Sequence, residues 1–236
     1  MINLIKNEYI KIGKYKIAFL FILFTMIVLI QYYLNKRIIM NNSLYLIPFV
    51  SLIMCIFFSG IFSSEMIDGT FRMYLTKGVS RKKIFLSKVL SIFILSFILT
   101  SYILILYYII IKDISCKFII KYYIYTIPIY FVNSMTILLS VLIKNIPINL
   151  GLCTFFIVFS GTISEYLFKN SIKFIEYLFL PYLDFTIFLN KTSINLINQE
   201  YSINLNIYYG IYINILFSII FIIIGYFNFI KKDIKY

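Results

Sequence analysis

The sequence predicts an all-α integral membrane protein, and three observations support that fold class. Hydrophobic residues make up 62% of the 236 residues, only 13% are charged, and the mean hydropathy is +0.95. A soluble domain is about half apolar and a quarter charged. Apolar runs of bilayer-spanning length recur along the chain, and the charged residues gather at the ends of those runs.

Six apolar runs are long enough to cross a bilayer as helices, because 18 helical residues span about 27 Å. None carries a charged residue in its interior, and the fifth is the shortest. No linker or internal repeat divides them, so we expect one transmembrane domain over residues 1–236. The runs are residues 17–34, 45–62, 89–111, 122–143, 149–164 and 208–230.

The distribution of Lys and Arg predicts the orientation of these spans. With the N-terminus inside, 14 of the 22 basic residues fall in cytoplasmic segments and 8 in outer ones, which favours both termini in the cytoplasm. No small-residue cleavage site follows the first run, so it is predicted to be a retained span rather than a signal peptide. The Lys, Ile, Asn and Tyr bias suggests a low-GC bacterium.

Two further segments are neither spans nor simple loops. Residues 2–16 alternate apolar and polar positions at helical spacing, which predicts a helix lying in the inner membrane interface; an unstructured basic leader is the alternative. Residues 174–189 are too short for a span and too apolar for a solvated loop, so we expect a pair of re-entrant or interfacial helices before the sixth span. Residues 190–206 have the composition of an Asn-rich polar outer loop.

Several classes of function are disfavoured by what the sequence lacks. Histidine is absent and the three cysteines have no paired spacing, so no metal site or disulfide framework is expected. There is no Gly-rich phosphate loop and no charge at mid-membrane, the usual devices of ATPases and ion-coupled carriers. The net charge of +13 is interpreted as topogenic charge beside anionic lipid rather than as a nucleic-acid footprint.

The longest charged segment between apolar runs, residues 65–88, holds six of the 22 basic residues. Ser63 or Ser64 can cap a helix start there, with Glu65 in the first turn near the positive end of the helix dipole. The segment lies between the second and third spans, on the predicted cytoplasmic side.

The rest of this segment predicts a short helix parallel to the membrane, followed by a tight return. Asp68 and Arg72 are four residues apart, which permits an ion pair. Gly78 can end the helix, and Ser80 can cap the next one. A surface loop that carries positive-inside charge is an equally good interpretation of these residues alone.

Several residues of the segment form a motif: Glu65-x3-Gly-Thr70, Leu75, Val79-Ser-Arg81 and Lys88. The motif resembles the segment after the second span of type-2 ATP-binding-cassette (ABC) exporter permeases. The layout also resembles that family, with an N-terminal interfacial helix, six spans, both termini inside and an apolar re-entrant segment before the last span. Gly78 stands where many members of that family have Pro, and this difference should loosen the turn.

The resemblance implies a coupling helix that docks into a groove on a separate ATPase subunit, which binds the ATP and Mg²⁺. It also implies two copies of that subunit and a second permease subunit, identical or a paralogue, as partners within the lipid membrane. Coupling to the ATPase would fall to Glu65, Asp68, Gly69, Thr70, Arg72, Ser80 and Arg81.

A few polar side chains within the spans are candidates for a translocation path. Small polar residues more often join helices to one another, which is the competing interpretation. The candidates are Ser51, Ser59, Asn133, Ser134, Thr136, Ser140, Asn214 and Ser218.

Three function classes follow from these observations. The first is the permease subunit of an exporter in the cell membrane, with an antimicrobial peptide, a drug-like compound or a lipid as cargo; it is not an enzyme by itself. The second is a membrane enzyme, against which the missing histidines argue. The third is a membrane scaffold or sensor that transports nothing.

Overall fold

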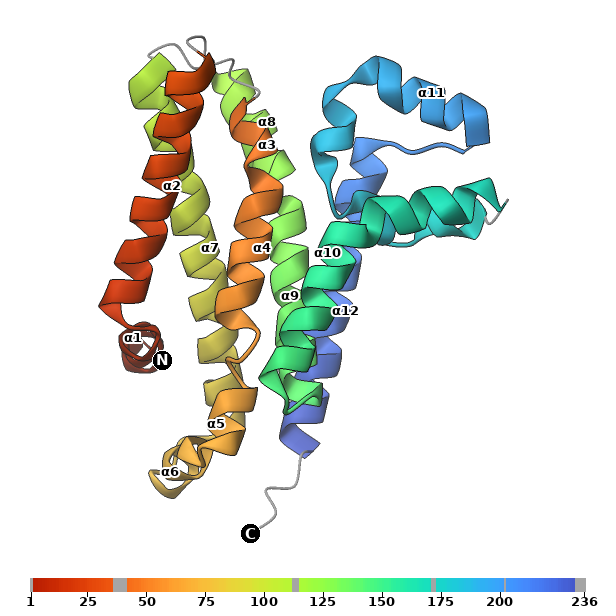
Figure 1. The fold of residues 1–236 in the computed structure, drawn as a ribbon. Helices are drawn as coiled ribbons and strands as arrows, with labels where there is room; N and C mark the ends of the chain where they lie inside the picture. The colour runs from red at the N-terminus through yellow and green to blue at the C-terminus, as the bar shows by residue number, and fades with distance from the viewer. Residues whose placement is uncertain (1, 36–41, 112–114, 171–172, 202, 232–236) are drawn as a thin grey trace.

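The described part of the chain forms helices and no strands, arranged as an upright bundle with a lateral arm (Figure 1). The computed structural model describes residues 2–35, 42–111, 115–170, 173–201 and 203–231. Five of its helical segments are long and apolar enough to cross a membrane, or six if the bent pair at the N-terminus is one span. An all-α membrane protein is therefore confirmed.

The five membrane-length segments match five of the predicted runs but extend beyond them. The third span begins at Arg81 and the fourth at Cys116, so each takes in lysines that the sequence placed in loops. The fifth, predicted as the shortest, has 24 residues. The segments are Ile47–Ile67, Arg81–Ile111 (α7), Cys116–Leu142, Ile146–Lys169 (α10) and Ile207–Lys231 (α12).

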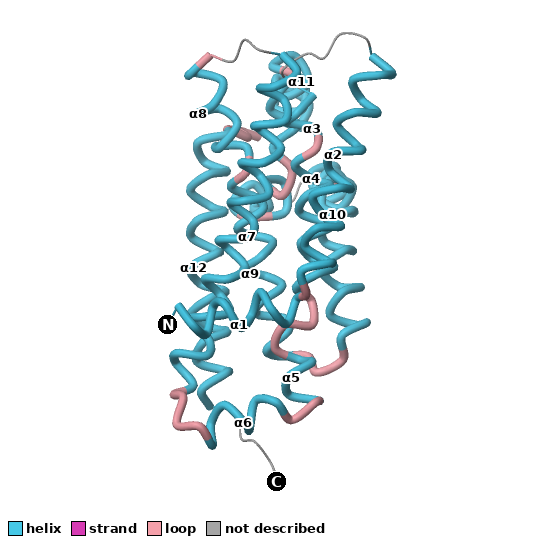
Figure 2. The backbone as a smooth tube through the Cα atoms, turned by 90° about the vertical axis from the view of Figure 1, so that its left-hand side faces the viewer, coloured by secondary structure: helices cyan, strands magenta, loops and turns pink. Residues whose placement is uncertain are grey.

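The N-terminal pair consists of α1 (Ile2–Ile12) and α2 (Lys14–Asn35). Gly13 separates them with a φ of 84°, which only glycine adopts easily, and the two helix axes meet at 70°. The helix predicted over residues 2–16 is therefore present, but it ends at Ile12. Figure 2 shows α1 crossing the bundle near one end, with the short helices α5 (Ser63–Ile67) and α6 (Thr70–Thr76) beyond it; we call this the α6 end.

Two spans are composite. The second joins α4 (Ile47–Phe58) and α5 (Ser63–Ile67), with a turn at residues 59–62, and the short helix α3 (Asn42–Tyr45) precedes it. The fourth joins α8 (Cys116–Tyr125) to α9 (Ile127–Leu142), where Pro128 stands in the first turn of α9. Proline lacks the N–H that the interior of a helix would use as a donor. In the first turn of α9 that N–H would have no partner within the helix, so Pro128 is tolerated there and the helix breaks before it.

The segment predicted to form a pair of re-entrant or interfacial helices, residues 174–189, belongs to the lateral arm, and its depth in the membrane stays a prediction. Figure 1 shows α10 rising beside α9 and then bending away from the bundle. The chain returns through three 3₁₀ turns, η1 (Lys173–Tyr177), η2 (Leu180–Tyr182) and η3 (Phe185–Leu189), and through α11 (Lys191–Tyr201). The prediction of a polar loop over residues 190–206 was wrong in part, because most of it is the helix α11.

Aromatic rings hold the α6 end together. The ring of Phe229, near the end of α12, lies 5.1 Å from that of Phe62 and 5.0 Å from that of Phe71 in α6 (Thr70–Thr76), and Phe62 lies 5.4 Å from Phe85 of α7. All four rings are buried. Edge-on ring pairs of this kind contribute about 0.5–1.5 kcal/mol beyond their area burial, so α6 is packed onto the bundle rather than tethered by a loop.

Candidate functional site

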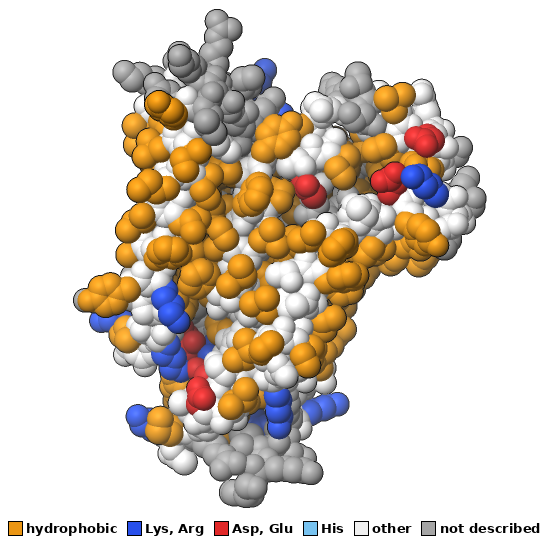
Figure 3. Space-filling view, viewed as in Figure 1, with side chains coloured by type: hydrophobic (Ala, Val, Ile, Leu, Met, Phe, Trp, Pro, Cys, Tyr) orange, Lys and Arg blue, Asp and Glu red, His pale blue; other side chains and the backbone are white. Residues whose placement is uncertain are grey.

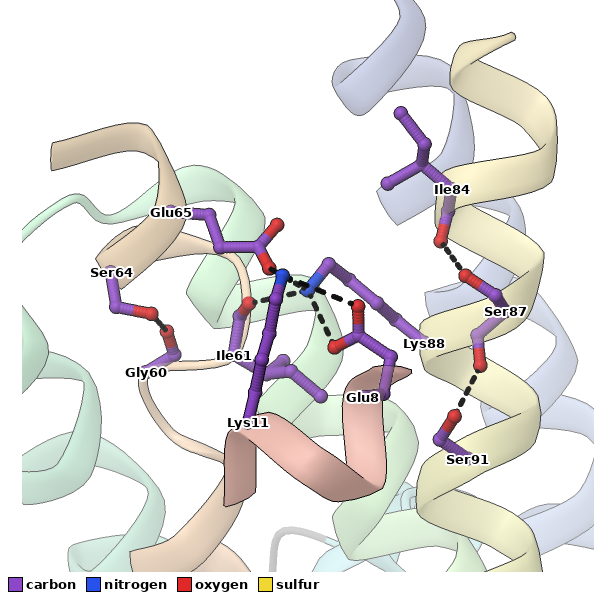
Figure 4. A network of polar contacts seen from close by, with 10 residues as sticks. All are labelled: Glu8, Lys11, Gly60, Ile61, Ser64, Glu65, Ile84, Ser87, Lys88 and Ser91. Atoms are coloured by element: carbon purple, nitrogen blue, oxygen red, sulfur yellow. Dashed lines mark hydrogen bonds and ion pairs between the residues drawn. The ribbon is translucent and has the colours of Figure 1, made fainter. Parts of the chain in front are cut away.

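Four charged side chains meet at the α6 end, where α1, α5 and α7 come together (Figure 4). Glu8 and Lys11 come from α1, Glu65 from α5 and Lys88 from α7; we call them the charge cluster. Lys88 is 1% exposed and Glu8 5%. The two acids of the charge cluster balance its two bases, as burial requires. Figure 3 shows acidic and basic side chains side by side there, on a face that is otherwise largely hydrophobic.

Lys88 is the centre of the charge cluster. Its Nζ lies 2.8 Å from Glu65 Oε1 and 3.0 Å from Glu8 Oε2. It also donates a hydrogen bond of 3.1 Å to the Ile61 carbonyl and lies over the ring of Phe62. All three donors of a lysine ammonium thus have acceptors within the chain, so Lys88 is satisfied while buried.

Lys11 closes the charge cluster from the rim. Its Nζ pairs with Glu65 Oε1, lies 3.6 Å from Glu8 Oε1, and lies 4.5 Å from the centroid of the Tyr74 ring. Burial by itself would lower the pKa of Lys11. The hydrogen bonds to Glu65 and Tyr74 and the charges of Glu65 and Glu8 outweigh burial, so the pKa lies above its ordinary value. Lys11 therefore stays charged at neutral pH.

The local sequence explains how α1 presents Glu8 to the bundle. Glu8 is the only acid of α1, and on a helical wheel it falls between Leu4 and Ile12, inside the apolar face. Tyr9, the next residue, donates a hydrogen bond of 3.1 Å from its hydroxyl to the Ser91 carbonyl of α7. Apolar packing and this bond hold α1 against α7, and Glu8 is buried as a result.

The segment that carries Glu65 is a pair of short helices rather than one. Gly69, with a φ of 70°, turns the chain between α5 and α6. Gly78 ends α6 as predicted: its N–H donates to the Leu75 carbonyl at 2.9 Å, and the Val79 N–H donates to the Tyr74 carbonyl at 3.1 Å. These two bonds form a Schellman motif, so the C-terminus of α6 is defined.

The residues predicted to couple to an ATPase fall into three groups. Glu65 and Arg81 are bound within the chain: Glu65 lies in the charge cluster, and Arg81 Nη1 donates at 2.6 Å to the Ile230 carbonyl at the end of α12. Asp68 and Ser80 lie on the surface.

The other predicted coupling residues lie on or beside α6. Gly69 forms the turn before it and Thr70 is its first residue. Arg72 belongs to α6, and its side chain lies outside the described part of the structure, so the Asp68–Arg72 ion pair stays a prediction.

The predicted path residues lie within the helix bundle, and their role in a path stays a prediction. Seven of the eight are buried and Ser218 is half-buried. The hydroxyls of the serines and Thr136 bond to carbonyls of their own helices. Asn133 donates at 2.6 Å to Ser96 of α7, and Asn214 donates at 2.9 Å to the Tyr182 carbonyl of η2. Among these residues Asn133 and Asn214 thus join separate elements, whereas the hydroxyls bond within their own helices.

A cavity of about 410 Å³ lies beside the charge cluster and is lined by Glu65, Asp68, Thr70 and Lys16 among others. Two buried oxygens at its wall, Glu65 Oε2 and Thr70 Oγ1, have no hydrogen-bond partner. Buried acceptors are normally satisfied, so the cavity has unmet capacity to accept hydrogen bonds. Within the described ranges, no group of three or more His, Cys, Asp or Glu side chains could hold a metal ion.

The sequence reasoning missed Lys11 and Lys88 as partners of Glu65, and Glu8 as a partner of both lysines. A signal for Glu8 was present, because an acid within the apolar face of an amphipathic helix requires a buried cation. Lys88 had no comparable signal, since its position at the start of an apolar run also fits topogenic charge.

The chain was compared with known proteins. A family model described as a protein of unknown function (DUF2705) matches residues 3–235. A search of curated proteins gives no match. Because the family model covers nearly the whole chain, the protein belongs to the DUF2705 family.

Proposed function

We propose that this chain is the membrane-spanning permease subunit of an ATP-driven ABC exporter, with α2 as the first of six spans and both termini in the cytoplasm. Its cargo is a hydrophobic or amphipathic compound, such as an antimicrobial peptide, a drug-like molecule or a lipid. Two copies of a separate ATPase subunit hydrolyse ATP, and a second permease chain completes the pathway. The proposal places the complex in the cell membrane of a low-GC bacterium.

The observation that carries the proposal is the form of the α5–α6 segment. It lies at the end of the bundle, and two of its apolar side chains face outward: Ile67 is 60% exposed and Met73 59%. Exposed apolar side chains among polar ones are typical of protein interfaces. The motif shared with ABC exporter permeases lies in this same segment.

The segment is also rigid enough to transmit a movement. Glu65 anchors α5 to α1 and α7, and Phe71 anchors α6 to α12. A partner that pushes on α6 therefore pushes on three other helices, whereas a flexible loop would absorb the displacement. This arrangement supports a coupling role for the segment as a whole, with Glu65 acting from inside.

The test uses an exposed residue, because Glu65→Lys would put a third cation into the charge cluster and could fail for structural reasons. Met73→Asp should abolish co-purification of the proposed ATPase subunit and the cargo-stimulated hydrolysis of ATP. Loss of a central apolar contact weakens an interface by about 2 kcal/mol or more, roughly thirtyfold. Expression and membrane insertion should match wild type.

The matched control is Leu196→Asp, which puts the same charge on an exposed leucine of α11, at the opposite end of the bundle from α6. It should leave ATPase binding and hydrolysis intact. Full ATPase binding by Met73→Asp, or equal loss in both variants, would count against coupling through α6.

A further inference from the structure

A groove leads from the charge cluster into the apolar part of the bundle. The 410 Å³ cavity at the charge cluster shares Lys16 and Phe57 with a second hollow of about 450 Å³. Phe19 and Ile56 line that second hollow between α2 and α4. The two volumes fall in the range of about 300–1,000 Å³ that small-molecule sites occupy.

The polar part of this groove offers two acceptors to a ligand that donates hydrogen bonds. Glu65 Oε2 and Thr70 Oγ1 are buried there without a partner, and the Glu65 side chain is 9% exposed. The other carboxylate oxygen, Oε1, is already held by both lysines of the charge cluster. In Figure 4 the second oxygen of Glu65 points away from them. An ammonium carries the N–H donors that such oxygens accept.

The remaining charges on the cavity wall fit a zwitterion. The four residues of the charge cluster neutralise one another, which leaves Asp68 and Lys16 among the lining residues. Neither makes an ion pair with another described side chain. An ammonium beside Glu65 and Asp68 and a phosphate beside Lys16 would complete this pattern.

The lining of the groove changes from polar to apolar away from the α6 end, as a membrane does from its surface to its interior. Its polar part lies at the α6 end beside α1, and its apolar part lies further along α2 and α4, beside Phe19 and Ile56. Both of those side chains are more than half exposed. An amphiphile with its headgroup in the first hollow and an acyl chain in the second would keep each part at its natural depth.

From these observations we infer that the groove is a binding site for a phospholipid with a primary amine in its headgroup, such as phosphatidylethanolamine. The ammonium donates to Glu65 Oε2 and Thr70 Oγ1, the phosphate lies beside Lys16, and one acyl chain lies against Phe19, Phe57 and Ile56. This inference does not depend on transport, and it would hold for any function of the chain.

The test is native mass spectrometry of the purified full chain, titrated with phosphatidylethanolamine or with phosphatidylcholine of the same acyl chains. The choline headgroup carries a charge but no N–H. We expect one ethanolamine lipid per chain, bound at least about tenfold more tightly than the choline lipid, as hydrogen bonds to a charged group predict. Equal binding of the two lipids would overturn the assignment.

Variants locate the site. Thr70→Val removes an orphan oxygen at constant shape and should weaken the ethanolamine lipid about tenfold. Ile56→Trp should fill the apolar hollow and weaken both lipids. The control is Ile105→Trp on α7, since Ile56 and Ile105 are both 52% exposed. Selective lipid binding that neither Thr70→Val nor Ile56→Trp alters more than Ile105→Trp would also overturn the assignment.

A competition experiment distinguishes binding of a lipid from binding of a soluble amine. Glycerophosphoethanolamine has the same headgroup without acyl chains and should not displace the bound lipid at equal concentration. Displacement at equal concentration would mean that the apolar hollow contributes nothing, and it would contradict the lipid assignment.

Discussion

At the scale of single residues, the chain buries the charge of Lys88, which costs free energy of desolvation. Lys88 lies seven residues into α7, about 10 Å from the start of that helix, and is 1% exposed. A buried ion pair gives little net stability over an apolar pair of the same shape, but removing one partner leaves an uncompensated charge. The charge cluster therefore fixes which helices meet and penalises any arrangement that separates them.

Removing the cation tests this account of Lys88. Lys88→Met leaves Glu8 and Glu65 buried with only Lys11 between them, and it should lower the free energy of unfolding by about 3–5 kcal/mol. Lys83→Met, at an exposed position of the same helix, should change it by less than about 0.5 kcal/mol. Circular dichroism of thermal unfolding in detergent measures both. Equal stability of the two variants would mean that Lys88 reaches water.

At the scale of elements, the arm between α10 and α12 is fixed by close packing. Gly210 of α12 faces the rings of Tyr182 and Phe185, and a Cβ there would lie 2.5 Å from Tyr182 Cδ1. Asn214, one turn further along, donates to the Tyr182 carbonyl. A close approach and a hydrogen bond thus hold η2 against α12.

Gly210→Ala should loosen this contact, because a tyrosine ring cannot move aside as a flexible chain end does. We expect a loss of about 1–3 kcal/mol in stability, together with faster proteolysis in the arm. Gly151→Ala in α10, where a Cβ meets nothing within 4 Å, should be neutral or slightly stabilising because alanine favours helix. If limited proteolysis cuts both variants as slowly as wild type, the arm is held by other contacts.

The same elements show what the sequence can predict. Length and hydropathy were enough to find the long apolar helices, because insertion depends on composition. They could not find α11: its Asn-rich composition indicated a loop, although Ile194, Ile197 and Tyr201 recur at helical spacing. Tyr201 stacks with Phe168 of α10, with 6.1 Å between ring centroids, and this tertiary packing decides the structure of the segment.

The candidate site was harder to predict than the spans. The charged segment, residues 65–88, and the end of α6 at Gly78 could be predicted from local signals. The pairing of Glu65 with Lys88 joins residues 23 apart, and that with Lys11 joins residues 54 apart. Similarly, Asn133 lies on α9 but its partner Ser96 lies on α7. Such pairings depend on how helices pack, which periodicity in a single helix does not encode.

At the scale of the whole molecule, α1, α5, α6 and the end of α12 gather at one end of the bundle, and α8 and α11 at the other (Figure 1). With six spans this corresponds to the orientation that the Lys and Arg distribution favours. The segments predicted to be cytoplasmic are then the ones that form the charge cluster and the proposed docking surface.

Cysteine labelling in intact cells and in inverted vesicles tests this orientation. In a Cys116→Ser background, which removes the exposed native thiol, Ser80→Cys should react only from the cytoplasmic side. Gln199→Cys, at an exposed position of α11, should react only from outside. Labelling of both positions from the same side would require an even number of spans between them, not the three that the account predicts.

The most direct test of the central claim is a photo-crosslink from α6 in the native membrane. A photoreactive residue at Met73 should join this chain to an ATPase subunit with a phosphate-binding loop, identified by mass spectrometry of the adduct. The same residue at Leu196 should give no such adduct. If Met73 yields only lipid adducts or proteins without an ATPase domain, the proposal that this chain is driven by a separate ATPase is contradicted.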